Sequence, residues 1–265
     1  MPKPEIRYGK YMYCIIRTPP LAGTGTTPET LQISNLGIGE RGDKVHTIDF
    51  MGIAAVVSDT PIQEYEESRR NMMAHTLVLE EVMRQRTILP VRFGTVAPST
   101  DAVLEQVLNR RYGGMISTFE EVENRVELGV KAFWYEGVIF QEIIEENPTI
   151  RSLRDSLKTR KAEETYYERI RLGEKIEAAM EKKREEDSEK ILEKLRPIVY
   201  KSRANKVITD KMVLNGAFLV DRSREPEFDE AMRILDAEMQ KRVMFKYVGP
   251  VPPYNFVNIV IHWDA

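Results

Sequence analysis

Residues Val45–Ser58 read VHTIDFMGIAAVVS and hold the clearest structural pattern in the chain. Two β-prone runs, Val45–Phe50 and Ile53–Ser58, are separated only by Met51 and Gly52. So short a connection with a glycine is typical of a tight turn between antiparallel strands, because glycine adopts the positive φ angles that such turns need. This stretch therefore predicts a β-hairpin and a β-sheet in the first half of the chain.

The segments on either side of this hairpin predict a strand before it and a helix after it. Tyr11–Ile16 is mostly apolar and β-prone, as expected of a central strand. Pro19–Gly42 is rich in Gly, Thr and Pro and predicts a long irregular connection. After the hairpin, Thr60 is expected to cap a helix whose first residue is Pro61, with Gln63 completing a capping box.

Further along, the helix is expected to end near Arg86, and Leu89–Phe93 predicts a short strand. Pro90 places this strand at a sheet edge or at a strand's first residue, because proline donates no backbone hydrogen bond. A second helix is expected from Ser99 or Thr100, bent or broken near Gly113 and Gly114. The order strand, strand, strand, helix, strand resembles a ferredoxin-like α/β unit whose first helix has become a loop.

The second half of the chain begins with the alternating run Val126–Trp134, which predicts a strand. A helix near Gly137–Glu145 follows, and then a charged stretch from Lys158 to Arg203. Residues 181–190 contain no apolar side chain, so a helix there is expected to be solvated on every side. We expect a long helix or helical hairpin that projects from the domain at its middle.

The C-terminal region predicts a return to alternating strands and helices. The expected elements are a strand at Val213–Val220, a helix at Glu227–Lys241 and strands at Val243–Val248 and Phe256–His262. Together these indicate an α+β protein of two domains, residues 1–123 and 124–265. The second is interpreted as a two-layer α/β sandwich with a long charged helical insertion.

Composition excludes several classes of function. The chain has 265 residues, of which 42% are hydrophobic and 31% charged, enough for one or two packed domains. Its net charge of -3 disfavours a general nucleic-acid binder. No apolar run reaches the roughly 18 residues of a membrane span, and Met1–Arg7 lacks the apolar core of a secretory signal. A cytoplasmic protein is the simplest interpretation.

Candidate chemical motifs are few. The string Gly37–Gly42 matches G-x-G-x-x-G, but an expected strand follows it where a phosphate loop needs a helix, which favours a flexible turn. His46, His75 and His262 have no second ligand at metal spacing. We expect His75, on an apolar helix face, to be a hydrogen-bonded structural residue. Cys14, the only cysteine, is interpreted as an inert core side chain.

Charged residues give no catalytic constellation either. Arg92 lies between Val91 and Phe93, so it must face solvent or find a carboxylate, and we favour a salt bridge at a sheet edge or between domains. The carboxylate pairs Glu80-Glu81 and Glu145-Glu146 are expected on solvated helix surfaces. The sequence therefore predicts no catalytic, cofactor-binding or metal-binding residues and no enzymatic activity.

Two segments that contain proline and glycine carry a family resemblance. The first reads RTILPVRFGTV (Arg86–Val96), and the second reads KYVGPVPPYNFV (Lys246–Val257). The prolines of the second predict a stiff, extended connection that packs on the protein or forms a docking surface, with packing favoured. Both segments resemble hallmark stretches of the gas vesicle protein F/L family, and the similarity covers nearly the whole chain. Val251 departs from the family pattern, in which an aromatic residue is common at this position.

The resemblance implies a role in gas vesicle formation. It implies two modified ferredoxin-like domains, no known cofactor, and association with the hydrophobic shell subunit, gas vesicle protein A, as a minor structural or chaperone-like component. Other accessory proteins are possible partners, and the gas vesicle is the expected location. We expect the N-terminal half to dock the shell subunit through an open sheet edge. The alternative is a small-molecule-binding regulatory module, whereas an RNA binder is disfavoured by the lack of basic, aromatic strands.

Overall fold

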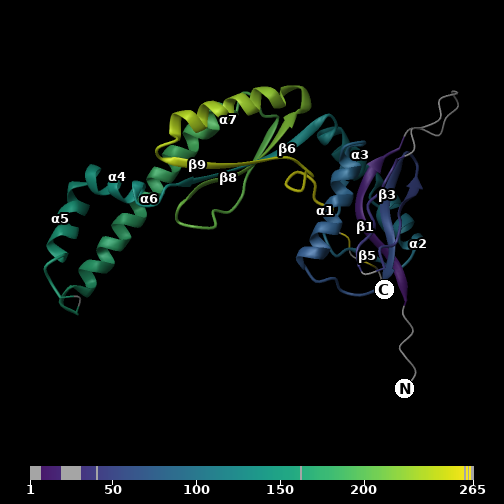
Figure 1. Ribbon diagram of the computed structural model, residues 1–265, viewed down its shortest axis with the longest axis horizontal. Coiled ribbons are helices and arrows are strands. Elements are labelled where there is room, and N and C mark those ends of the chain that lie inside the picture. Colours follow the sequence, from purple (N-terminus) through teal and green to yellow (C-terminus); the bar gives the residue numbers. More distant parts are fainter. Residues whose placement is uncertain are drawn as a thin grey trace, which may run out of the picture. The chain divides into compact units, whose positions relative to one another are not determined.

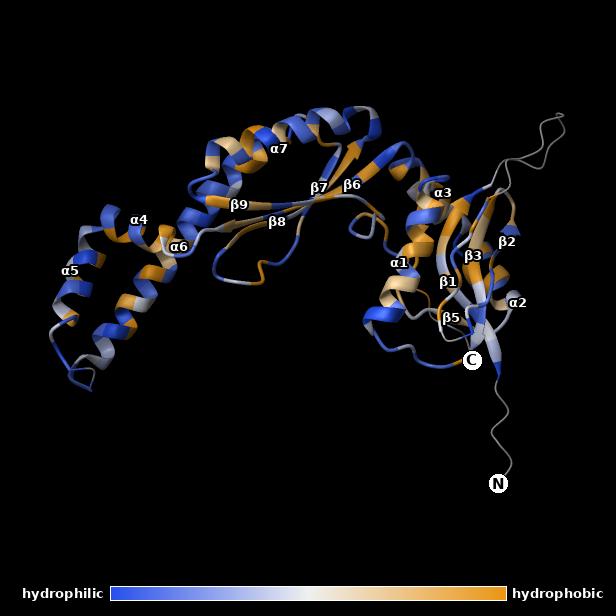
Figure 2. Ribbon diagram, in the orientation of Figure 1, coloured by the Kyte–Doolittle hydropathy of each residue, from blue (hydrophilic) through white to orange (hydrophobic). Residues whose placement is uncertain are grey.

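The computed structural model describes residues 7–18, 31–39, 41–161, 163–259, 261 and 263 (Figure 1). The chain forms two compact units, one of Met1–Glu127 with Pro250–Ala265 and the other of Leu128–Gly249. Each unit contains one antiparallel sheet together with helices, so the protein is a mixed α+β protein, as predicted. Strands β1 (Tyr8–Arg17), β3 (Ile53–Pro61) and β6 (Arg125–Trp134) carry much of the apolar sequence (Figure 2).

The sheet of the first unit has the strand order β2-β3-β1-β4, and β5 also pairs with β1. Its strands are β1 (Tyr8–Arg17), β2 (Val45–Phe50), β3 (Ile53–Pro61), β4 (Ile88–Pro90) and β5 (Val96–Ala97). The predicted hairpin is confirmed: β2 pairs with β3 from Val45↔Ser58 to Phe50↔Ile53. Met51 and Gly52 both have positive φ, as the primed turns of two-residue hairpins require.

A bulge in β1 aims side chains at the core of this unit. Met12 pairs with Val57 and Cys14 pairs with Val56, so Tyr13 is an extra residue between them. As a result Tyr11, Tyr13 and Cys14 all join one buried cluster with Val78, Leu79 and Val82 of the following helix. Cys14 is completely buried, in agreement with its interpretation as a core side chain.

The predicted start of the first helix was wrong. Thr60 and Pro61 belong to β3, where they pair with Gly9 and Tyr8, and the Thr60 hydroxyl bonds to Tyr65. Pairing with the long strand β1 outweighs the local capping signal. Helix α1 (Arg69–Met83) begins eight residues later, and the hydroxyl of its N-cap Ser68 accepts a bond from the Asn71 N–H at 3.3 Å.

The rest of the first unit follows the expected order. The strand predicted at Leu89–Phe93 is β4, which ends at Pro90 and lies at a sheet edge as expected. Ser99 caps the next helix by accepting from the Ala102 N–H at 3.1 Å. This helix is divided into α2 (Thr100–Ala102), the π-helix η1 (Val103–Asn109) and α3 (Tyr112–Val122). The break therefore lies just before Gly113, close to its predicted position.

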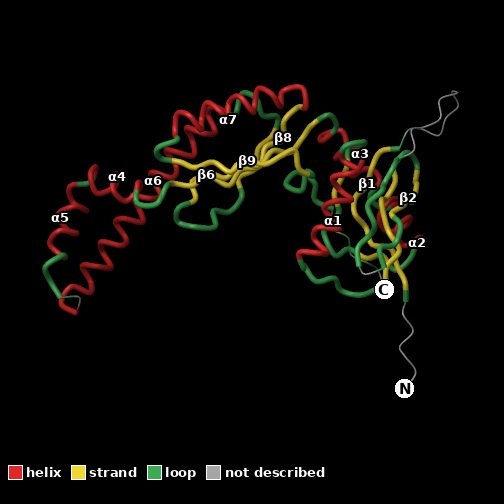
Figure 3. Tube along the Cα trace, in the orientation of Figure 1, coloured by secondary structure: helices red, strands yellow, loops and turns green. Residues whose placement is uncertain are grey.

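The sheet of the second unit has the order β7-β8-β6-β9. Figure 3 draws these strands in yellow. Its strands are β6 (Arg125–Trp134), β7 (Lys201–Ala204), β8 (Met212–Asp221) and β9 (Val243–Val251). Its helices are α4 (Val138–Glu146), α5 (Pro148–Leu157), the short η2 (Glu163–Thr165), α6 (Tyr166–Leu195), the short η3 (Arg222–Arg224) and α7 (Glu225–Met239). The sequence patterns did not predict β7 or α5, both of which lie in or beside the charged stretch.

The charged stretch forms the 30-residue helix α6, but it is not solvated on every side. α6 packs on α4, α5, α7 and β8. Asp187, in the middle of the segment without apolar residues, is 0% exposed. The prediction of a fully solvated segment was therefore wrong, because Asp187 is buried through a hydrogen bond with Trp134 and an ion pair with Arg242, both outside α6.

The C-terminal segment also differs from its prediction. Residues Tyr254–Phe256 form a turn, and 257–259 form no strand, so the strand expected at Phe256–His262 is absent from its described part. The Phe256 and Val257 N–H groups both bond to the Pro253 carbonyl, which curls the chain after the prolines. By its contacts this segment groups with the first unit. His262 lies outside the described residues.

Candidate functional site

The polar centre of the first unit is the His75 cluster, which we define as His75 with Tyr11, Tyr13, Phe93 and Tyr254. α1 directs His75 inward, and the imidazole is 1% exposed. Its Nδ1 lies 3.0 Å from the Tyr11 hydroxyl and its Nε2 lies 2.9 Å from the Tyr254 hydroxyl. The Tyr13 ring stacks on the imidazole with centroids 5.6 Å apart. The prediction of a hydrogen-bonded structural histidine is confirmed.

This cluster brings together the two segments that carry the family resemblance. From the first segment, the Gly94 N–H donates to the Tyr11 hydroxyl at 3.0 Å, and the Phe93 ring meets His75 edge-on at 5.6 Å. From the second segment, Tyr254 reaches His75 across 179 positions of sequence. Sequence reasoning singled out His75 and both segments separately, but spacing alone gave no sign that they meet.

A second anchor holds the C-terminal segment beside this cluster. The carboxylate of Glu127, which is 3% exposed, accepts the Asn255 backbone N–H at 2.9 Å and its side-chain amide at 2.6 Å. Hydrogen bonds to a buried carboxylate are stronger than neutral ones. Pro252, Pro253 and Val257 are buried around this anchor. The segment therefore packs on the protein, as favoured by the sequence analysis.

Electrostatics make the His75 cluster neutral. Burial lowers the pKa of His75 from its ordinary 6.5 to about 4. Burial likewise raises the pKa of Tyr11 and Tyr254 above their ordinary value, and raises that of Tyr13 to about 12. At neutral pH the imidazole therefore shares hydrogen bonds with the Tyr11 and Tyr254 hydroxyls without charge, and Tyr13 stacks on it. Such an arrangement fixes side chains in place and offers no activated nucleophile.

The other candidate residues of the first unit have structural roles. In the Gly37–Gly42 string, Gly39 and Gly42 have positive φ and the chain continues into β2, which confirms a turn in place of a phosphate loop. Arg92 is exposed, and the salt bridge favoured for it at a sheet edge or between domains stays a prediction. His46 is on β2, where its ring lies 3.3 Å from the Lys44 carbonyl.

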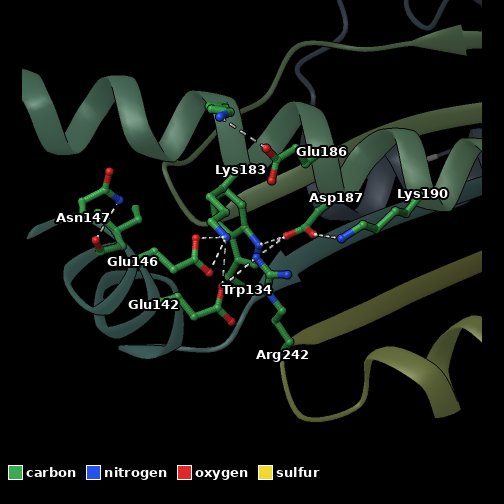
Figure 4. Close-up of polar contacts among 11 residues, drawn as sticks. Trp134, Glu142, Glu146, Asn147, Lys183, Glu186, Asp187, Lys190 and Arg242 are labelled. Atoms are coloured by element: carbon green, nitrogen blue, oxygen red, sulfur yellow. Dashed lines mark hydrogen bonds and ion pairs between the residues drawn. The ribbon is translucent and has the colours of Figure 1, made fainter.

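The polar centre of the second unit is the Asp187 network, which sequence analysis missed (Figure 4). We define it as Trp134, Glu142, Glu146, Lys183, Asp187 and Arg242. The Asp187 carboxylate accepts from Trp134 Nε1 at 2.8 Å and pairs with the Arg242 guanidinium at 2.9 Å. Its other oxygen has no hydrogen-bond partner, and the nearest cation to it is the Lys190 ammonium at 3.7 Å.

This network joins three elements of the second unit. Arg242, just before β9, pairs with Glu142 of α4 at 2.8 Å as well as with Asp187 of α6. Lys183, one helical turn before Asp187, pairs with Glu146 of α4 at 2.7 Å. A buried charge is tolerated only when it is paired, so each ion holds its neighbours in place. Glu145 and Glu146 are both exposed on α4, as expected, and Glu146 pairs with Lys183 from this surface.

A groove of about 530 Å³ opens beside the Asp187 network, between α6 and α7. Its cations, Lys190, Lys194 and Arg242, are matched by carboxylates on the same walls, such as Glu238, which lies 3.4 Å from Lys194. Within the described residues, no three His, Cys, Asp or Glu side chains are arranged to hold a metal ion. In the same residues, no helix has the length and apolar character of a membrane span.

Comparison with known proteins agrees with this arrangement. Residues 9–258 match the family model described as "Gas vesicle synthesis protein GvpL/GvpF". The chain belongs to the GvpL/GvpF family. The match includes both segments of the His75 cluster, which confirms the family resemblance found in the sequence.

Individual relatives of the GvpL/GvpF family support this over most of the chain. Gas vesicle protein F of Streptomyces sp. (strain CB03234) is 31% identical over 222 residues, 84% of this chain and 91% of that protein. Gas vesicle protein F of Dolichospermum flosaquae is 27% identical over 238 residues, 88% of this chain and 94% of that protein. The crystal structure of GvpF from Anabaena sp. PCC7120 has a TM-score of 0.80 at 26% identity, covering 95% of this chain and 99% of that one.

Proposed function

We propose that this protein is a non-enzymatic accessory factor of gas vesicle formation that binds the hydrophobic shell subunit, gas vesicle protein A. The observation that carries the proposal is the family match over residues 9–258. A shell subunit destined for a gas-facing wall exposes apolar surface before assembly, and such surface aggregates unless it is covered. A cytoplasmic protein that covers or positions the subunit, as a chaperone-like or minor structural component, removes this hazard.

The docking surface that we propose lies in the first unit, beside β2. This strand is an edge of its sheet, and residues 31–34 run past it. Between the two is a groove of about 490 Å³, lined by Leu31–Ser34 and Lys44–Thr47. An extended apolar segment fits such a groove, because an edge strand offers backbone hydrogen bonds and Leu31 and Ile33 offer apolar contact.

One wall of this groove is held by α1. The Glu81 carboxylate accepts the Ser34 N–H at 2.8 Å and the Asn35 N–H at 3.0 Å, and Gln85 accepts the Gln32 N–H at 3.1 Å. These bonds fix residues 32–35 on the helix, and they leave Ile33 partly exposed to the groove. A fixed wall lowers the entropy cost of binding an extended segment.

Regarding architecture, we propose that both units are modified ferredoxin-like α/β sandwiches and that α4, α5 and α6 enlarge the second. We further propose that the N-terminal domain ends near Glu123. The two strand-and-helix layers of each unit and the end of the first compact unit at Glu127 support this division. Limited proteolysis of the full chain tests it: the first cuts are expected outside β6 and β9, and early cuts within these strands would contradict it.

The docking proposal is tested by co-purifying the full-length protein with tagged gas vesicle protein A. Ile33→Glu places a charge in the groove and is expected to reduce recovery of the complex at least tenfold. Ile208→Glu makes the same change at a residue that is 69% exposed in the second unit, and it is expected to leave recovery unchanged. Equal recovery of both variants would refute the β2 groove. A wild-type protein that fails to bind the shell subunit would refute the function itself.

A further inference from the structure

The sheet of the second unit has one face covered by helices. Trp134 of β6 bonds to Asp187 of α6, and Phe218 of β8 contacts Phe228 of α7 with ring centroids 5.6 Å apart. Tyr247 of β9 faces the same way, since its hydroxyl donates to Asp229 of α7 at 2.6 Å. α6 and α7 thus pack on this face (Figures 1 and 3).

The residues that alternate with these point to the opposite face. Lys246 lies over the Phe133 ring, 5.4 Å from its centroid, and the Val248 side chain lies against Gly129. In β7, Lys201 and Arg203 pair with Leu219 and Ala217, the β8 neighbours of Phe218 that face away from α7. We define the cationic sheet face as the set Lys131, Phe133, Lys201, Arg203, Met244, Lys246 and Val248.

The cationic sheet face differs in charge from the chain as a whole. The protein carries a net charge of -3, yet four of these seven residues are cations and none is a carboxylate. The carboxylates on the same face lie at strand ends. Glu127 holds Asn255 by hydrogen bonds, and Asp221 is close enough to Arg224 to raise that residue's pKa. The part of the face around Lys131 and Lys246, away from these carboxylates, is therefore positive.

The same face also exposes apolar surface. Val248 is 55% exposed and Met244 is 38% exposed, and Phe133 is partly exposed. Cations interleaved with apolar side chains on a flat sheet favour a partner with the reverse charge and the same alternation. We propose that the cationic sheet face binds an acidic segment of a partner protein in which carboxylates alternate with apolar side chains.

Single-stranded nucleic acid, another polyanion, fits the face less well. It binds sheets through stacked bases, but Phe133 is the only ring of the set and Lys246 already covers it. An anionic membrane is a further polyanion, and the test below separates it from an acidic segment.

This surface belongs to the second unit, whereas the shell subunit is proposed to dock on β2 in the first. The inference therefore goes beyond the proposed function and can hold or fail independently of it. With both surfaces occupied, the protein holds two partners on one chain, which raises the effective concentration of each partner near the other.

The test uses the full-length protein and a fluorescein-labelled 12-residue peptide of alternating Glu and Val, followed by fluorescence anisotropy. The peptide is expected to bind, and binding is expected to weaken as NaCl rises from 50 to 300 mM. The double variant Lys131→Glu, Lys246→Glu is expected to weaken binding at least tenfold. The control variant Lys158→Glu, Lys182→Glu makes the same charge change at exposed helix positions and is expected to have less than a twofold effect.

Several results would overturn the proposal. One is an equal loss of peptide affinity in the two double variants. A second is equal affinity for a peptide in which Lys replaces Glu. A third is tighter binding of a 12-nucleotide single-stranded DNA, or of vesicles with anionic lipid, than of the acidic peptide. Self-association of the protein through this face, seen as a rising mass in light scattering that the Lys131, Lys246 variant abolishes, would also replace it. Thermal melting of each variant establishes that it is folded, and Phe133→Ala supplies a second variant without charge reversal, expected to weaken peptide binding threefold or more.

Discussion

The His75 cluster and the Asp187 network each bury a titratable side chain, the first in a neutral form and the second in ion pairs. Both use this side chain to join segments far apart in sequence. His75 is neutral, and its two hydrogen bonds reach Tyr11 and Tyr254. Asp187 remains surrounded by cations, with Arg242 at 2.9 Å. The stability that the His75 cluster contributes is therefore sensitive to acid, whereas the stability that the Asp187 network contributes is sensitive to the loss of one ionic partner.

The largest effect is expected from breaking the Asp187 network on one side. Arg242→Met removes the guanidinium and leaves a fully buried carboxylate without its closest cation. We expect a loss of about 3–5 kcal/mol in the free energy of unfolding, measured by urea titration. Adding Asp187→Leu to Arg242→Met is expected to recover most of this loss, since the uncompensated charge is then gone. A double variant as unstable as the single one would contradict the ionic interpretation.

The next effect concerns acid and the His75 cluster. The pKa of His75 in the folded protein is about 4, below the ordinary 6.5. Between these two pH values the imidazole therefore binds a proton in the unfolded chain and not in the folded one. Stability is therefore complete above pH 6.5 and falls as the pH drops toward 4, by about 3 kcal/mol for 2.5 pH units. His75→Phe is expected to flatten this part of the stability profile, whereas the control His46→Gln leaves it unchanged. An unchanged profile in His75→Phe would assign the acid sensitivity elsewhere.

A smaller effect is expected at the wall of the β2 groove. Burial raises the pKa of Glu81, but the hydrogen bonds from Ser34 and Asn35 outweigh it and hold the pKa at about 2. The folded pKa is depressed, so this stabilisation is present above the ordinary 4.5 and is lost as the pH falls through about 2. Glu81→Gln is expected to cost about 1–2 kcal/mol and to speed hydrogen exchange at residues 34 and 35. The neighbouring Glu80→Gln is the control, and equal exchange in both variants would contradict the anchoring.

The smallest effect is expected from removing the hydrogen bond between Tyr254 and His75 in the His75 cluster. Tyr254→Phe removes the hydroxyl that bonds to His75 and keeps the ring. We expect it to lower the free energy of unfolding by about 1 kcal/mol. Hydrogen exchange at Val257, whose N–H bonds to the Pro253 carbonyl at 2.9 Å, is expected to accelerate with it. Tyr200→Phe, at an exposed tyrosine of the second unit, serves as the matched control. Unchanged exchange at Val257 would show that Glu127 alone holds the segment.

Local patterns predicted much of the fold. The hairpin, the strands β1, β6, β8 and β9, and the helices α3, α4 and α7 all follow from apolar alternation or helical spacing. The start of α1 did not, because Thr60 and Pro61 make better bonds in β3 than in a cap. β7 was missed because a four-residue edge strand of exposed side chains has no alternation to detect.

Local patterns likewise predicted one part of the candidate site and not the other. His75 and the two resemblance segments were visible in the sequence, since one is a histidine on an apolar face and the others are proline- and glycine-punctuated. Asp187 was not, because its burial depends on Trp134 and Arg242, which are 53 and 55 positions away. An aspartate in a wholly polar run carries no sign of burial. The tryptophan at the end of β6, with an N–H that needs an acceptor, was the available clue.

The central claim is that this member of the GvpL/GvpF family is required for gas vesicle assembly. The most direct measurement is pressure-sensitive light scattering of host cells from which its gene is deleted, before and after complementation. Gas vesicles collapse under pressure, so the scattering lost on collapse reports their amount. We predict that the deletion removes this signal, that wild-type protein restores it and that Ile33→Glu restores it poorly. Normal pressure-sensitive scattering in the deletion strain would contradict the account.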